Sequence, residues 1–171
     1  FARRWPKRGY AIVRCALDLG LRAGEIARLM ISDIDWRAGT VTLRGTKSFR
    51  QDILPLPVET GQALADYLQH ERPPSTSSAI FVHPMVPRGE PSTAGAIQKV
   101  IINAYRRCDL PHSGSHALRH TLACRLVEHG SSLKEVADLL RHRSLNTTLI
   151  YAKLDTPKLS TVPLPWPGSE S

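Results

Sequence analysis

The sequence predicts a mixed α+β fold that is mainly helical and contains a small three-stranded antiparallel sheet. Two patterns lead to this prediction. Over most of the chain, apolar residues recur about every 3.6 positions, as they do on the buried face of an amphipathic helix. Between residues 33 and 56 the period falls to two, and turn residues separate short alternating runs. With 171 residues, the chain is long enough to form one domain with a sizeable core.

The first two predicted elements are helices. Residues 6–19 place their apolar side chains on one face, and Gly20 is a plausible cap for the C-terminal end. Arg22 follows at once and opens a second helix, in which Glu25 lies one turn further on. Two interpretations of this pair are open. It is either an ordinary surface ion pair worth a few tenths of a kcal/mol, or an arrangement in which Glu25 holds a working arginine in place.

Three short runs then alternate as antiparallel strands do, at residues 34–36, 40–43 and 52–56. Residues 37–39 form the turn after the first run, and residues 45–50 form the turn after the second. Lys47 therefore lies at or near the tip of the second hairpin. A lysine in such a place is most often simply solvated, so its position alone does not assign it a function.

Further helices follow the sheet. They are predicted at residues 58–72, 93–108, 116–129 and 132–142, with a proline-rich irregular connection between the first two. Ser92 or Thr93 is the expected cap of the second, and Ser132 forms a capping box with Glu135 at the start of the fourth. Ser144 is the expected cap of a final helix.

The helix predicted at residues 116–129 carries polar groups on its apolar face. His116 and Arg119 fall in one row with Ala123 and Leu126, so we expect both to point toward the core. A buried arginine needs a partner, because removing its charge from water costs several kcal/mol. An acidic residue or an anionic ligand would meet that need. From this stretch alone, two interpretations stay open. Arg119 either forms a structural salt bridge beside a hydrogen-bonded core histidine, or it belongs to a site that binds an anion.

Composition and charge narrow the class of protein. The formal net charge is +8, from 23 lysines and arginines against 15 acidic residues, which favours a polyanionic partner and nucleic acid ahead of a membrane surface. No apolar run approaches the roughly 20 residues of a membrane span, and no signal peptide is visible, so we expect a soluble protein. Cys15, Cys108 and Cys124 lie in apolar patterns and predict free thiols in a reducing compartment.

Several other chemistries fit poorly. His112, His116 and His120 are spaced by four, but no cysteine or carboxylate completes a zinc site, and we expect neither a metal nor a cofactor. The sequence lacks a Gly-rich phosphate loop, a nucleophile elbow and a glycosidase-like carboxylate pair. The serious rival is a helix-turn-helix DNA-binding unit in SLKEVADLLRHRSLNTTLIYAK. That interpretation does not explain why His116 and Arg119 would point toward the core, and it gives no role to Lys47 near the hairpin tip.

Four motifs, in the order LGLRAGEIARL, GTKSFRQDILPLP, HALRH and LLRHRSLNTTLIYAKL, resemble the catalytic domain of tyrosine recombinases, the phage-integrase family. The resemblance covers about residues 8–155 and implies the fold of DNA breaking-rejoining enzymes. It assigns six catalytic positions: Arg22, Lys47, His116, Arg119, His142 and Tyr151. It also makes Glu25 and Arg141 supporting residues, and it implies a reaction that needs no metal.

The implied reaction is attack by Tyr151 on a DNA phosphate, which forms a 3′-phosphotyrosine and stores the bond energy for rejoining. Charge on the non-bridging oxygens must be neutralised during in-line attack, and Arg22 and Arg119 would do this bidentately. His116 is the candidate base for the phenol proton, and Lys47 would give a proton to the departing 5′ oxygen.

His142 would complete this site by hydrogen-bonding a phosphate oxygen. Two alternatives stay open: a catalytically silent module that only holds DNA, and an enzyme like a type IB topoisomerase. Arg141 departs from the family pattern, which usually has glycine just before the later histidine. We expect it to add a contact to a DNA phosphate.

Residues 1–155 are therefore predicted to be the catalytic domain, and residues 156–171 a Pro-rich tail that is a candidate for packing on a neighbouring protomer. The chain begins at Phe1, without an initiator methionine, and is expected to lack the family's upstream core-binding domain. DNA binding should then be weak and strongly salt-dependent. The expected partners are double-stranded DNA, further copies in a tetramer, and accessory DNA-bending proteins. We expect the protein in the bacterial cytoplasm, at the nucleoid.

Overall fold

The computed structural model describes residues 5–45, 51–111 and 113–141. These residues form a mainly helical domain with a three-stranded antiparallel sheet, which confirms the predicted fold class. In chain order the elements are α1 (Lys7–Asp18), α2 (Ala23–Arg28), the short 3-10 helix η1 (Ile31–Asp33), β1 (Ile34–Asp35), β2 (Thr40–Arg44), β3 (Gln51–Pro55), α3 (Val58–His70), α4 (Ala94–Arg107), α5 (Ser115–Glu128) and α6 (Leu133–Leu139).

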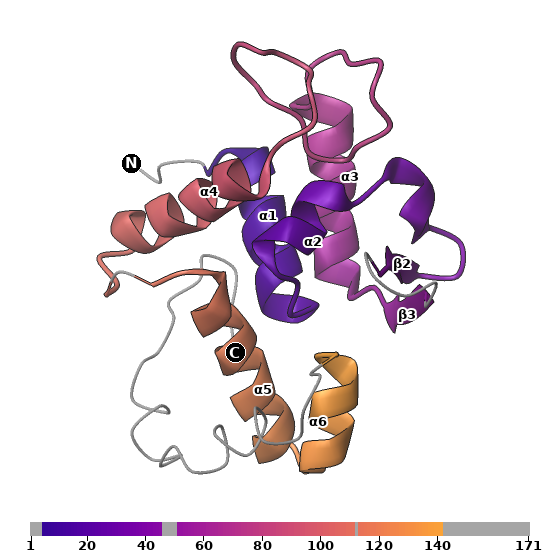
Figure 1. The fold of residues 1–171 in the computed structure, drawn as a ribbon, viewed down its shortest axis with the longest axis vertical. Coiled ribbons are helices and arrows are strands. Elements are labelled where there is room, and N and C mark those ends of the chain that lie inside the picture. The colour runs from indigo at the N-terminus through magenta and orange to yellow at the C-terminus, as the bar shows by residue number, and fades with distance from the viewer. Residues whose placement is uncertain (1–4, 46–50, 112, 142–171) are drawn as a thin grey trace.

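Helix α1 is the centre of the domain. In Figure 1 it lies in the middle of the ribbon, with α2, α3 and α4 around it and the α5–α6 pair at one end. Ala11, Ile12 and Cys15 are fully buried, because neighbouring helices cover α1 on several sides. Burial raises the pKa of the Cys15 thiol to about 12, so this cysteine is a packing residue. All three cysteines are free, as predicted.

Gly20 ends α1 in the left-handed conformation expected of a C-terminal cap, with φ +60°. Its missing side chain has a second consequence. A Cβ atom built on Gly20 would lie 2.6 Å from a terminal carbon of Leu140 and 3.0 Å from one of Leu122. The end of α1 therefore approaches α5 and the end of α6 more closely than any other residue type would allow.

The sheet has the order β1-β2-β3, and both pairs of neighbouring strands are antiparallel. Val41 pairs with Leu54, and both side chains are buried, whereas Ile53 on the other face is 66% exposed. The last pair in the ladder between β2 and β3 is Arg44 with Gln51. The predicted second hairpin is confirmed by these two strands, but Lys47, in the connection between them, lies outside the described residues.

Two arginines, buried Arg8 and half-buried Arg72, hold the irregular connection between α3 and α4. Arg8 on α1 donates to the carbonyl of Val82 at 3.1 Å and to the hydroxyl of Ser92 at 2.8 Å, while Arg72 donates to three backbone carbonyls of the connection. The predicted cap of the next helix is Thr93, whose hydroxyl accepts from the third residue along.

Helices α5 and α6 pack on each other through a small apolar cluster of their own, formed by Ala123, Val136 and Leu140. Ser132 and Glu135 make the predicted capping box at the start of α6. The pair joins the rest of the domain where α5 packs on α1. In the parts of the chain described above, no helix combines the length and the apolar composition needed to cross a membrane.

Candidate active site

Arg22 and Glu25 form the pair that their spacing predicted. The Glu25 carboxylate accepts a hydrogen bond from the Arg22 backbone N–H at 2.7 Å and lies 3.4 Å from the Arg22 Nη1. The first bond caps α2, because it satisfies an N–H that has no partner inside the helix. The second contact is long, and the Arg22 side chain is 44% exposed, so Glu25 holds the backbone of Arg22 firmly and its guanidinium loosely.

Arg119 is buried in α5, with 2% of its surface exposed, as the helical pattern predicted. Its Nη1 donates to the backbone carbonyl of Gly20. This partner is neither an acidic residue nor an anionic ligand, the two that sequence reasoning considered. A carbonyl just past the end of a helix lacks an intrahelical donor and lies at the negative end of the helix dipole, so it attracts a cation. Because the carbonyl has no net charge, this bond holds the guanidinium of Arg119 in place but supplies no opposite charge to it.

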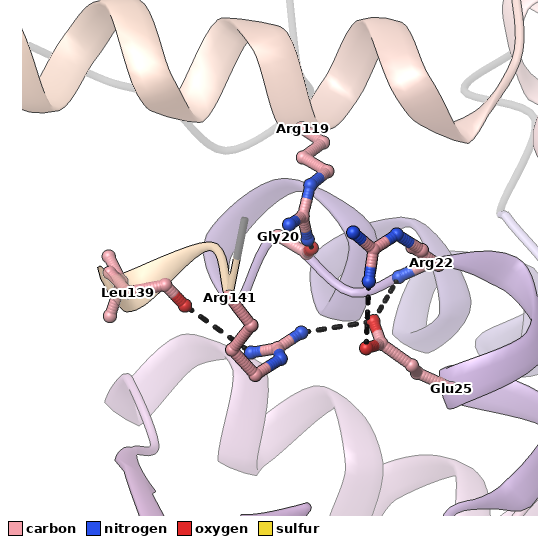
Figure 2. A network of polar contacts seen from close by, with 6 residues as sticks. All are labelled: Gly20, Arg22, Glu25, Arg119, Leu139 and Arg141. Carbon is pink, nitrogen blue, oxygen red and sulfur yellow. Dashed lines mark hydrogen bonds and ion pairs between the residues drawn. The ribbon is translucent and has the colours of Figure 1, made fainter. Parts of the chain in front are cut away.

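This hydrogen bond brings the two arginines of the predicted site together. Gly20 and Arg22 are two residues apart, so their α-carbons lie within about 7 Å. Arg119 reaches this turn from α5, and Figure 2 shows its guanidinium at the Gly20 carbonyl beside the side chain of Arg22. Two cationic groups, one from each half of the domain, therefore face the same turn.

Arg141 lies just beyond α6 and joins the same network (Figure 2). Its Nη2 donates to the Glu25 carboxylate at 3.0 Å, and its Nη1 donates to the Leu139 carbonyl at 3.3 Å. The backbone of Arg141 has φ +52°, a left-handed conformation that favours glycine. The glycine that the family usually has before its later histidine is thus explained by the backbone. The side chain is 14% exposed and paired with a carboxylate.

The charge of Glu25 is stabilised by these contacts. Burial acts to raise the pKa of Glu25, but the Arg22 backbone N–H and the nearby charges of Arg141 and Arg22 act more strongly in the opposite direction. The pKa therefore lies below its ordinary value, and the carboxylate is ionised at neutral pH.

The prediction that His116 faces the core is wrong, because its side chain is exposed. An α-helix turns by about 100° per residue, so His116 lies about 60° around α5 from Arg119 and about 160° from buried Leu118. It therefore occupies the edge of the buried stripe, in the first turn of the helix. The apolar cluster that α5 shares with α6 includes Leu122 and later residues only. Exposure leaves the imidazole accessible to a ligand at the surface.

Three further site residues cannot be placed: Lys47, His142 and Tyr151 lie outside the described residues. Their sequence neighbours can be placed. Arg141, which immediately precedes His142, is bonded to Glu25, and Arg44, three residues before Lys47, forms an ion pair with Asp33 at 2.9 Å.

A cavity of about 710 Å³ connects these two neighbourhoods. Its lining includes Glu25, Asp33, Arg44 and Arg141, so charged groups of both signs surround it. Across residues 5–45, 51–111 and 113–141, no group of three or more histidine, cysteine or acidic side chains is arranged to hold a metal ion.

Comparison with known proteins identifies the family. Residues 3–157 match the sequence profile of the Phage integrase family, which is most of the chain. The chain belongs to the phage integrase family. The fold agrees, because the XerH site-specific recombinase, solved in a post-cleavage complex with a palindromic difH substrate, superimposes with a TM-score of 0.74 at 25% identity, covering 90% of this chain and 44% of XerH.

Proteins that are similar in sequence are also named as integrases or recombinases. The putative integrase/recombinase y4rA of Sinorhizobium fredii is 41% identical over 94% of this chain, and the tyrosine recombinase XerC of Oceanobacillus iheyensis is 32% identical over 85% of it. The match spans 39% of the length of y4rA and 48% of the length of XerC. This integrase-family chain thus corresponds to less than half of either relative.

Sequence reasoning missed two parts of the site. It assigned Gly20 only the role of a helix cap, and it did not pair Arg141 with Glu25. The expected contact between Arg141 and a DNA phosphate stays a prediction. One signal was available for Gly20, since the glycine directly precedes the segment that carries Arg22. No signal in the sequence pairs Glu25 with a residue 116 positions away.

Proposed function

We propose that this integrase-family chain is the catalytic domain of a site-specific DNA recombinase. The observation that carries the proposal is the position of Arg119, which is buried, fixed by the Gly20 carbonyl and directed to the turn from which Arg22 extends. Two guanidinium groups near one another provide paired donors for the two non-bridging oxygens of a phosphodiester. Such donors stabilise the charge of the transition state most when they are fixed in advance.

In the proposed reaction, the phenol oxygen of Tyr151 bonds to the phosphorus while the bond from phosphorus to the 5′ oxygen breaks. The phenol proton passes to His116, and Lys47 supplies a proton to the departing 5′ oxygen. His142 donates a hydrogen bond to a phosphate oxygen. Attack by a 5′ hydroxyl on the 3′-phosphotyrosine then reverses these steps and rejoins a strand without an external energy source.

The proposed substrate is double-stranded DNA. A net charge of +8 supports this partner, and so does the likeness to XerH, which was solved with its difH substrate. Two strands must be cut in each of two duplexes, so we propose that four copies assemble on DNA, with residues 156–171 packing between protomers. Accessory DNA-bending proteins would then assist the assembly. With such a substrate, we propose that the protein acts at the bacterial nucleoid, in the cytoplasm.

The test is covalent trapping on DNA. The full chain is incubated with a library of duplexes that have a randomised core and a nick beside it, so that cleavage releases a short fragment and prevents rejoining. We expect a protein–DNA adduct that survives detergent and that maps to Tyr151, and we expect Tyr151→Phe to form none. Arg119→Ala should reduce adduct formation at least a hundredfold, because it removes a donor to the transition state.

Arg125→Ala is the matched control for Arg119→Ala. Arg125 lies on the same helix, carries the same charge and is exposed, so its loss should change the rate by less than about threefold. DNA binding without any adduct in the wild type would favour a silent DNA-binding module. Relaxation of supercoiled plasmid at any sequence would favour the topoisomerase-like alternative.

A further inference from the structure

The single carboxylate of Glu25 serves two arginines. Its Oε2 accepts from the Arg22 backbone N–H at 2.7 Å and from the Arg141 Nη2 at 3.0 Å, whereas its Oε1 lies 3.4 Å from the Arg22 Nη1. The Arg141 side chain is 14% exposed and the Arg22 side chain 44%. Glu25 thus lies closer to the guanidinium of Arg141 than to that of Arg22, and the Arg141 side chain is less exposed to solvent.

This difference matters because one carboxylate carries one negative charge. While Arg141 balances that charge, the guanidinium of Arg22 remains available to another anion. Without Arg141, the partly buried carboxylate would have Arg22 as its remaining cationic partner in the network (Figure 2). A shorter ion pair between Glu25 and Arg22 would then compete directly with any phosphate that approached Arg22.

We propose that Arg141 is a positioning residue that occupies the charge of Glu25 and so leaves the guanidinium of Arg22 free to bind an anionic phosphoryl group. The inference rests on the proposed function, in which Arg22 grips a DNA phosphate. It also accounts for an arginine at a position with φ +52°, where a residue other than glycine is strained. The bond to Glu25 compensates for that strain.

Removing Arg141 and then the charge of Glu25 should have opposite effects. Arg141→Gly relieves the backbone and leaves Glu25 to pair with Arg22, so the affinity of Arg22 for phosphate should fall about fivefold or more. Adding Glu25→Gln to Arg141→Gly should restore most of that affinity. The amide keeps an oxygen for the Arg22 backbone N–H, so α2 stays capped, but it carries no charge to hold the guanidinium.

Recovery of phosphate affinity in the double variant distinguishes this inference from a purely structural role of the ion pair between Arg141 and Glu25. If Arg141 and Glu25 only fastened the end of α6 to α2, Glu25→Gln would add nothing to Arg141→Gly or would make it worse. Arg141→Asn is a second variant of the same kind, because asparagine tolerates a left-handed backbone and also removes the charge. Arg141→Lys keeps the charge and should retain affinity close to that of the wild type.

Arg44→Gly is the matched control. Arg44 lines the same cavity and pairs with Asp33 at 2.9 Å, and Asp33 in turn caps a backbone N–H at 2.9 Å, as Glu25 does. The substitution removes the same charge from the same cavity without touching Glu25. It should change the phosphate affinity of Arg22 by less than twofold, which excludes a general effect of net charge.

The measurement is a titration of the full chain with inorganic phosphate, followed through the Nε–H NMR signal of Arg22, with thermal unfolding of each variant as the check on folding. Wild-type affinity in both Arg141→Gly and Arg141→Asn would overturn the inference. So would a double variant that binds no better than Arg141→Gly. Phosphate binding requires neither Tyr151 nor DNA, so the expected pattern without any covalent DNA adduct would support the inference and contradict the proposed function.

Discussion

The guanidinium of Arg119 and the carboxylate of Glu25 each bond to a residue far away in the sequence, and these contacts influence what charge the site presents. Arg119 bonds to a neutral carbonyl of Gly20, so its charge is fixed in place without being cancelled by that bond. Glu25 is the acidic residue of the network and pairs most closely with Arg141. At the scale of single residues, the guanidinium groups of Arg22, Arg119 and Arg141 and the carboxylate of Glu25 thus lie in one network (Figure 2), which supports the proposed anionic ligand.

The lowered pKa of Glu25 predicts how stability depends on pH. A carboxyl group whose pKa is lower in the folded than in the unfolded protein contributes stability above its unfolded pKa, near 4.3, and loses that contribution as the pH falls through the folded pKa. We expect the wild type to exceed Glu25→Gln by about 1–2 kcal/mol in the free energy of unfolding at pH 7.

Urea unfolding of both proteins at several pH values between 7 and 3 tests this expectation. The difference between them should persist down to about pH 5 and shrink below about pH 4.3. A difference that grew as the pH fell would mean that the charge of Glu25 is unfavourable in the folded protein.

At the scale of elements, the turn between α1 and α2 is the point at which α5 and α6 contact the segment that carries Arg22. Gly20 combines a left-handed backbone, a carbonyl that binds Arg119, and a missing side chain that admits Leu122 and Leu140. These three features come from one residue, two positions before Arg22. The pair formed by α5 and α6 is therefore located against the segment that carries the first arginine of the site.

Gly20→Ala should consequently affect both stability and activity. The left-handed conformation costs an alanine about 1–2 kcal/mol, and the new methyl group must also displace the ends of Leu140 and Leu122. Gly39→Ala is the matched control, because Gly39 has φ +65° but nothing within 4 Å of an added Cβ atom.

Chemical unfolding should therefore show a larger loss in the free energy of unfolding for Gly20→Ala than for Gly39→Ala. The difference between the two losses measures how tightly Leu122 and Leu140 pack against the turn between α1 and α2. Adduct formation on nicked DNA should fall for Gly20→Ala only, since the bond from Arg119 depends on the local position of the Gly20 carbonyl. Equal losses in both assays would mean that backbone strain is the whole effect.

At the scale of the whole molecule, the site lies where two packed units meet. One unit is formed by α1 to α4 with the sheet, around a core that includes Ile12, Leu64 and Phe81. The other is the α5–α6 pair, which has a small apolar cluster of its own and also contributes Leu118 to the main core. Arg22 and Glu25 belong to the first unit, and Arg119 and Arg141 to the second. Packing of the two units thus assembles the charged groups of the site.

The net charge of +8 predicts the salt dependence of DNA binding. Each phosphate neutralised by a basic side chain releases bound counterions, so the affinity for duplex DNA should fall more than about tenfold between 50 and 200 mM salt. Fluorescence anisotropy of a labelled duplex, titrated with the full chain at four salt concentrations, measures the slope. An affinity that hardly changed with salt would argue against binding through the DNA backbone.

The sequence alone determined the local parts of this protein. The α-helices between residues 7 and 139, the three strands, the cap at Ser132 and the pairing of Arg22 with Glu25 follow from patterns within a few residues, because the helical and strand repeats place such neighbours directly. The helix predicted after Ser144 lies outside the described residues. The inward position of Arg119 followed in the same way. The inward position predicted for His116 did not hold, because a residue at the edge of a helical stripe is buried only if a neighbouring element covers it.

Only the tertiary structure decided how the charges are connected. Arg119 reaches Gly20 across 99 residues of sequence, and Arg141 reaches Glu25 across 116. Such contacts depend on how α5 and α6 pack against α1 and α2, and that packing depends on the combined fit of many apolar side chains, which no local pattern specifies. The candidate residues of the site could therefore be predicted from the sequence, whereas the partners of Arg119 and Arg141 were determined by the tertiary structure.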